Sequence, residues 1–176
     1  RFWGNDNMAW QQPSLFGTAE LIGYVADDVM GIPMATSAPE IDGVLDDSWI
    51  DQSVSIDMGT YVFTNADAVD GSYTEIEEWE DAQMDFRVMW DADALYLWVA
   101  VIDDEISISG GNSYENDGIE VCVDGDNAKT EGSYDADDIQ YRWVWSLGND
   151  ANAPNSVNAW GELDELDGYT AEIMIP

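Results

Sequence analysis

The chain has 176 residues, with 38 acidic and 4 basic residues, no histidine and a formal net charge of −34. Four scattered cations cannot form a basic patch, which excludes binding to a nucleic-acid backbone or to an anionic membrane surface. The lack of histidine excludes a Ser-His-Asp triad, a Cys-His pair and His-ligated zinc or haem. Apolar residues make up 45% of the chain, enough for the packed core of one domain.

The acidic residues are spread along the whole chain among aromatic and β-branched residues, as on a folded surface and not as in an acidic tail. Two explanations stay open, and both can hold. One is adaptation to a high-salt habitat, where screening shortens the range of charge repulsion. The other is neutralisation by bound divalent cations such as calcium, which short loops rich in Asp and Asn suit.

We interpret residues 1–38 as a lead-in segment, with the last strands of a preceding domain as the alternative. From residue 39 to residue 176 the pattern is that of one all-β domain. Turn sequences separate five segments that alternate or are apolar in the manner of strands, at residues 84–90, 95–102, 119–123, 139–146 and 169–175. Strands at this short spacing, with no long helical period, predict an antiparallel β-sandwich of the jelly-roll or immunoglobulin-like kind. Cys122 is predicted to be a strand residue and not a nucleophile. No run of apolar residues is long enough for membrane insertion.

Charged and amide side chains interrupt these apolar strands at Arg87, Glu120, Gln140, Arg142 and Glu172. Because charges in half-buried strands need partners, we expect the two arginines to meet the two glutamates on one sheet face. A cross-strand ladder of ion pairs without a ligand would explain them. A sugar-binding platform would do so equally, since Arg and carboxylate groups bond hydroxyls in fixed directions and aromatic rings stack on sugar rings.

The stretch PEIDGVLDDSW at residues 39–49 resembles the opening pattern P-x-I-D-G-x-x-D-x-x-W of family 9 carbohydrate-binding modules. Further segments similar to that family follow in the same order. They are FRVMWD at residues 86–91, LY at 95–96, VIDD at 101–104, YENDGIEV at 114–121, DDIQYR at 137–142 and GYTAEIMIP at 168–176.

The resemblance implies a β-sandwich without catalytic activity, in a secreted or cell-surface protein, often joined to the other domains of a larger chain such as a xylanase. Its members bind the ends of β-glucan and xylan polysaccharides and carry calcium. They hold the sugar between two Trp rings with an Arg and a Glu, and these positions fall here on Tyr114 for the first ring, Glu120 and Arg142. The second ring of the family follows the last motif, beyond Pro176, so we expect the closing strands to be missing from this chain.

The turn at residues 124–127, DGDN, offers carboxylate oxygens at alternate positions, as calcium loops do. Asp124 and Asp126 are therefore predicted metal ligands, and Asp137 and Asp138 are placed to close the site from the next strand. An ordinary Asp/Gly turn without a metal is the alternative.

The sequence thus predicts a carbohydrate-binding domain whose ligand is a polysaccharide or oligosaccharide. A structural or assembly domain without a sugar site is the first alternative, which the substitution of Trp by Tyr114 favours. A haem-binding domain of the ethylbenzene-dehydrogenase γ-subunit kind, using residues such as Met89 and Lys129, is a lesser one. The Glu-rich residues 75–81 are interpreted as a solvated segment and not as a glycosidase pair.

Overall fold

The computed structural model describes residues 18–20, 29–57, 83–128, 134–145, 147–149, 153, 155–163 and 167–176. In chain order the elements are β1 (Thr18–Glu20), β2 (Val29–Gly31), α1 (Asp47–Gln52), β3 (Val54–Asp57), β4 (Gln83–Trp90), β5 (Leu95–Ile102), η3 (Ser113–Glu115), β6 (Gly118–Asp124), β7 (Asp138–Val144), β8 (Gly148–Asn149), β9 (Val157–Glu162) and β10 (Gly168–Ile175).

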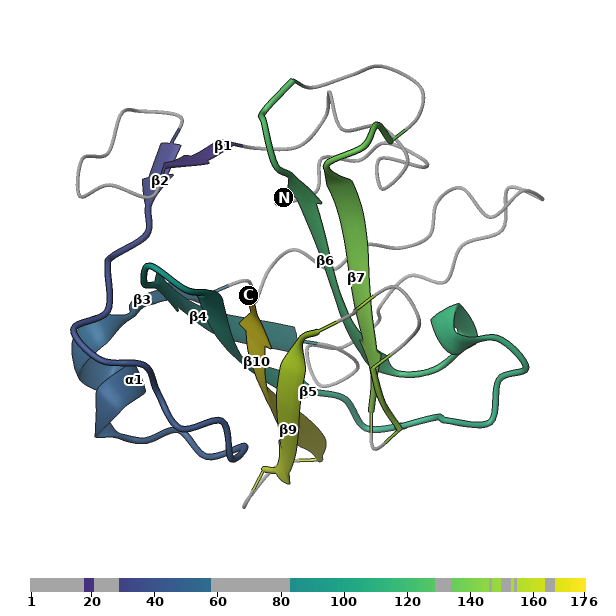
Figure 1. Ribbon diagram of the computed structural model, residues 1–176. Coiled ribbons are helices and arrows are strands. Elements are labelled where there is room, and N and C mark those ends of the chain that lie inside the picture. The colour runs from purple at the N-terminus through teal and green to yellow at the C-terminus, as the bar shows by residue number, and fades with distance from the viewer. Residues whose placement is uncertain are drawn as a thin grey trace.

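Two antiparallel sheets face each other, which confirms the predicted all-β sandwich (Figure 1). One sheet has five strands in the order β3-β4-β5-β10-β9, and the other has three in the order β6-β7-β8. The short strands β1 and β2 form a separate parallel pair. In Figure 1 the β6–β7 pair stands beside the larger sheet, and α1 lies on the other side of β4.

The main core lies between the two sheets and follows the predicted alternation. The odd-numbered residues of β10 (Tyr169, Ala171, Ile173 and Ile175) pack there against the apolar face of β7, with Tyr141 and Trp143. The strand predicted to reach residue 146 ends at Val144 in β7, and Ser146 lies outside the described residues. The chain turns there, with the Trp145 amide donating to the Asp117 carbonyl at 2.8 Å.

A second apolar cluster covers the opposite face of the five-stranded sheet. Trp49 of α1, which is fully buried, packs there with Met89, Tyr96 and Trp98. The cap of this short helix is Asp46, whose carboxylate accepts hydrogen bonds from the amides of Ser48 and Trp49. Strand β5 is therefore covered on both faces, as its almost wholly apolar sequence predicts.

Glu172 is fully buried in this second face and pairs with no arginine of the described residues, which corrects the pairing expected from the sequence. Its Oε2 accepts hydrogen bonds from the backbone amides of Asp42 at 2.5 Å and Gly43 at 2.7 Å. Arg87 lies in the same cross-strand row, but Trp98 separates the two. The side chain of Arg87 instead donates to the Ser53 hydroxyl at 3.4 Å, and within the described residues it makes no ion pair.

Gly43 fixes the segment that covers Glu172. Its φ of +89° belongs to the region that favours glycine, and a Cβ there would lie 2.8 Å from the backbone of Trp160 in β9. The Gly43 carbonyl also accepts a hydrogen bond from the Thr170 hydroxyl at 2.9 Å. The Ile-Asp-Gly part of the first motif therefore ties the chain to β9 and β10 and does not line an open surface.

The segment before residue 39 also contacts the sandwich. Ile32 belongs to the main core and Ala35 to the second cluster, and the Ala35 amide donates to the Trp90 carbonyl at 2.7 Å. The domain boundary at residue 39 stays a prediction. Lys129 and residues 75–81 lie outside the described residues. Across the part of the chain that is described, no helix has the length and apolar character needed to span a membrane.

Candidate functional site

The outer face of the β6–β7 pair carries the polar residues of both strands. Strand alternation turns Ile119, Val121 and Val123 of β6 into the core and leaves Glu120 and Cys122 outside. The register then places Glu120 opposite Arg142, and Cys122 opposite Gln140. All four side chains therefore share one face of the smaller sheet.

Arg142 lies at the centre of the site predicted from the sequence. Its Nε forms an ion pair with Glu120 Oε1, and its Nη1 donates to the Ser113 hydroxyl at 3.2 Å. Gln140 Nε2 donates to the second oxygen of Glu120 at 2.7 Å. These contacts hold the guanidinium and the carboxylate in place, while 38% of the Glu120 side chain stays exposed.

Tyr114 belongs to the short helix η3, and 65% of it is exposed. The guanidinium carbon of Arg142 lies 5.7 Å from the centre of its ring. Hydrogen bonds at both ends of the loop fix this position, since the Gly110 amide donates to Asn116 Oδ1 at 2.8 Å and the Asp117 amide donates to the Ser107 carbonyl at 2.9 Å. The three residues predicted as ligand contacts thus lie together.

A hollow of about 200 Å³ opens at these residues, lined by Ser113, Tyr114, Asn116, Gly118, Glu120, Arg142, Trp143 and Val144. It presents an exposed aromatic ring beside a fixed cation and a fixed carboxylate. Such a surface can stack one face of a small ring and bond its hydroxyls from the side.

The sequence analysis did not give Ser113, and it gave Gln140 only as a polar residue within a strand. Ser113 accepts from Arg142, and Gln140 orients Glu120. The position of Gln140 beside Arg142 could be predicted from the sequence, because Gln140 lies two residues before Arg142 in an alternating strand and so shares its face. Ser113 has none, since a loop residue can be placed against the sheet only by the tertiary structure.

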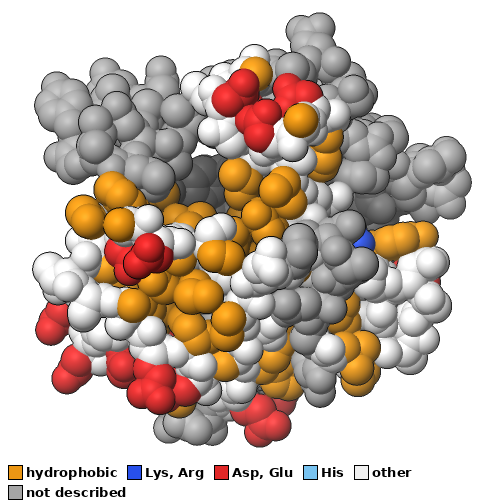
Figure 2. All heavy atoms as spheres, viewed as in Figure 1, with side chains coloured by type: hydrophobic (Ala, Val, Ile, Leu, Met, Phe, Trp, Pro, Cys, Tyr) orange, Lys and Arg blue, Asp and Glu red, His pale blue; other side chains and the backbone are white. Residues whose placement is uncertain are grey.

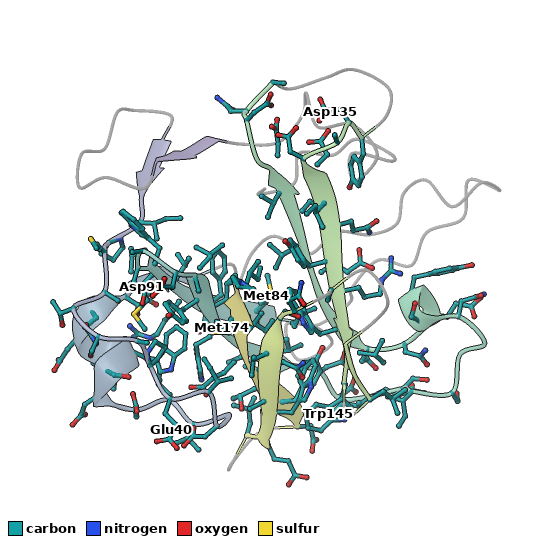
Figure 3. The ribbon with its side chains drawn as sticks, viewed as in Figure 1. Glu40, Met84, Asp91, Asp135, Trp145 and Met174 are labelled. Carbon is teal, nitrogen blue, oxygen red and sulfur yellow. The ribbon has the colours of Figure 1, made fainter. Side chains whose placement is uncertain are left out.

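The acidic turn lies at the far end of the same two strands, where Figure 3 labels Asp135. Asp124, Asp126 and Asp137 each have a carboxylate oxygen within 4.8 Å of the others. Partial burial and then the negative charge of Asp126 raise the pKa of Asp137. Asp138, the fourth predicted ligand, is buried beside the turn, and its Oδ2 accepts from the Asp135 amide at 2.8 Å.

Cys122 is held between the site and this turn. Its sulfur accepts a hydrogen bond from the Tyr134 hydroxyl at 3.6 Å, and burial raises the pKa of its thiol. A raised pKa leaves little thiolate at neutral pH, so the strand role predicted for Cys122 fits its surroundings.

Acidic side chains outnumber basic ones on the face of the molecule that Figure 2 shows. Figure 2 shows Asp and Glu in several separate places and very little Lys or Arg on the face in view. This distribution agrees with the exclusion of nucleic-acid backbones and anionic membranes as partners.

Comparison with known proteins identifies relatives of this chain. The chain is 32% identical over 160 residues to exoglucanase XynX of Acetivibrio thermocellus, covering 87% of this chain and 13% of that protein. It is 27% identical over 178 residues to endo-1,4-beta-xylanase A of Thermotoga neapolitana, covering 95% of this chain and 15% of that protein. The chain therefore spans only a small part of the curated relatives that it matches.

Solved structures of family 9 carbohydrate-binding modules share the fold. A module from Caldicellulosiruptor kristjanssonii in complex with glucose superposes with a TM-score of 0.61 at 24% identity, covering 81% of this chain and 66% of that one. A module from the same organism in complex with cellotriose gives a TM-score of 0.60 at 24% identity, covering 81% and 65%. The profile of the family described as carbohydrate family 9 binding domain-like matches residues 41–176. The chain therefore belongs to the carbohydrate family 9 binding domain-like family.

Proposed function

We propose that this domain binds carbohydrate without transforming it, and that it holds the ends of β-glucan or xylan polysaccharide chains at Tyr114, Glu120 and Arg142. One observation carries the proposal. An exposed aromatic ring, a guanidinium and a carboxylate from three different elements meet at one hollow.

The chemistry of the three groups supports a sugar ligand. The ring of Tyr114 is exposed enough to stack on the apolar face of a pyranose, whose C–H groups are attracted to an aromatic surface. Arg142 supplies donors and Glu120 supplies acceptors for the hydroxyls at the ring edge. The site is built in advance, because Ser113 and Gln140 already hold both charged groups.

A binding role suits this carboxylate better than a catalytic one. Both oxygens of Glu120 already accept hydrogen bonds, from Arg142 and Gln140, which orients them toward a ligand's hydroxyls. The solved neighbours are described in complex with glucose and cellotriose, and the relatives are named as xylanases and an exoglucanase. By analogy, this domain would act beside other domains of a secreted or cell-surface protein.

We test this function by titrating the chain with glucose, cellobiose and xylobiose and following Trp fluorescence or heat. We expect saturable binding of cellobiose, which is lost when the reducing end of the sugar is chemically reduced. Arg142→Ala should lower the affinity at least about tenfold, because a charged hydrogen bond contributes roughly 1.5–3 kcal/mol.

The other described arginine provides a matched control. Arg87 lies on the outer face of the larger sheet, so Arg87→Ala removes the same charge and should leave sugar affinity unchanged. If Arg142→Ala instead lowers the melting temperature sharply, and no sugar in the set binds the wild type, the domain is a structural or assembly unit.

We further propose that Asp124, Asp126 and Asp137 hold a structural calcium ion. Two carboxylates of the turn and that of Asp137, which directly precedes β7, have oxygens within 4.8 Å of one another and match the oxygen ligands that calcium takes. Bound there, calcium would fix the connection between β6 and β7.

Thermal unfolding tests the metal. Calcium at millimolar concentration should raise the melting temperature and a chelator should lower it, because an ion that binds only the folded state stabilises that state. Asp126→Asn should reduce this response, and Asp93→Asn, at the β4–β5 turn of the other sheet, should not. An equal response in both variants would contradict a site at this turn.

A further inference from the structure

We propose that the sugar site continues along the β6–β7 face into a second subsite at Tyr134 and Gln140, which takes the next neutral sugar unit of the polysaccharide. This second subsite rests on the sugar-binding function proposed above. It adds residues outside the cluster of Tyr114, Glu120 and Arg142, and it concerns how many sugar units the domain recognises.

The geometry begins with a separate hollow of about 250 Å³. Its lining residues are Tyr134, Asp138, Ile139 and Gln140, none of which lines the hollow at Tyr114. Asp138, Gln140 and Arg142 are alternate residues of β7 and point to the same outer face. The second hollow therefore follows the first along the strand, toward the end where Figure 3 labels Asp135.

Gln140 connects the two hollows. Its amide nitrogen donates to Glu120 in the first, at 2.7 Å, while the residue itself lines the second. Within the described residues its amide oxygen accepts no hydrogen bond. That oxygen is therefore suited to accept from a hydroxyl of a ligand lying across both hollows.

Tyr134 supplies an aromatic ring to the second hollow. Its hydroxyl donates to the sulfur of Cys122, which places the ring over the outer face one strand position beyond Glu120. The ring is half-buried, and its hydrogen bond to Cys122 reduces the conformational entropy that the side chain loses when a ligand packs on it. The arrangement repeats that of the first hollow, with an aromatic ring beside a hydrogen-bonding strand residue.

Spacing and charge define the ligand. Arg142 and Asp138 are four residues apart on β7, about 13 Å at roughly 3.3 Å per residue, which exceeds the length of one sugar ring. Asp138 lines the second hollow and the acidic turn lies at the same end of the two strands, so a neutral sugar unit fits the hollow and a uronate would be repelled.

The test compares glucose with cellotriose on the wild type, Tyr134→Ala and Tyr134→Phe. We expect the wild type to bind cellotriose more tightly than glucose. Tyr134→Ala should lower the cellotriose affinity about two- to tenfold, the range for an aromatic contact, and leave the glucose affinity unchanged. Tyr134→Phe keeps the ring and loses its hydrogen bond to Cys122, so its cellotriose affinity should lie between those of the wild type and Tyr134→Ala.

Each other outcome has a definite meaning. Three results would each overturn the second subsite alone. They are equal affinities of the wild type for the two sugars, an equal loss of affinity for both sugars in Tyr134→Ala, and a Phe variant that behaves as the Ala variant. Binding of neither sugar would overturn the sugar-binding function as well.

A measurement on the wild type does not depend on how the variants fold. The amide NMR signals of residues 138–140 should shift with cellotriose and not with glucose, and no difference between the sugars would overturn the subsite.

Discussion

The two outer faces of the sandwich use the same sequence feature in opposite ways. Each has a glutamate in the middle of an apolar strand, Glu172 in β10 and Glu120 in β6. Glu172 is fully buried and bonded to backbone amides, whereas the Glu120 side chain is 38% exposed and bonded to Arg142 and Gln140. One carboxylate holds the fold together, and the other is presented to solvent.

The difference arises from what covers each sheet. The segment before α1 crosses the larger sheet and brings the amides of Asp42 and Gly43 onto Glu172, with Trp49 packed beside them. Over the smaller sheet, the loop containing η3 brings Tyr114 and Ser113 to Arg142 of β7, and 38% of the Glu120 side chain stays exposed. The burial of a charge within a strand therefore depends on which segment of the chain packs over it.

The largest effect expected from this comparison is that of Glu172→Ala. It leaves the buried amide of Gly43 and the partly buried amide of Asp42 without an acceptor, and at about 1–3 kcal/mol for each group we expect a loss of roughly 3 kcal/mol in the free energy of unfolding. Glu172→Gln keeps an acceptor and should lose much less. Urea unfolding measures both, and a loss below about 1 kcal/mol for the Ala variant would contradict the structural role.

Glu120→Gln should have a smaller effect on stability, under about 1 kcal/mol, because a partly exposed ion pair contributes little to stability. Sugar affinity should fall in the same variant, since the carboxylate is proposed to accept hydroxyl hydrogen bonds. Unfolding and titration of one preparation measure the two quantities. A stability loss as large as that of Glu172→Ala would identify the Glu120–Arg142 pair as a structural ladder instead.

The smallest effect concerns pH. Burial raises the pKa of Glu172, and the amides of Gly43 and Asp42 oppose this only in part. A carboxyl with a higher pKa in the folded state contributes its full stability below its ordinary pKa of 4.5, and that contribution is lost as the pH rises through the folded value. The stability of the wild type relative to Glu172→Gln should therefore fall as the pH rises above about 4.5. Urea unfolding of both proteins across this range measures the difference, and a constant or rising difference would contradict the raised pKa.

Much of the fold could be predicted because strand alternation is a local property. The β4–β5 hairpin and β10 follow the period-two pattern of their residues. Helix α1 and strand β9 were not predicted, because six residues of helix show no clear period and β9 has few apolar residues. Of the candidate site, Tyr114, Glu120 and Arg142 came from the resemblance of motifs, and the alternation of β6 and β7 placed the latter two on one face.

The sequence by itself determined the strands, the faces of their side chains and the acidic character of the surface, since these depend on residues close together in the chain. Only the tertiary structure decided that Glu172 is bonded to amides of residues about 130 positions away, while Glu120 stays open to solvent. The burial of a charge depends on which distant segment packs over it. The local pattern is the same for both glutamates and does not contain that information.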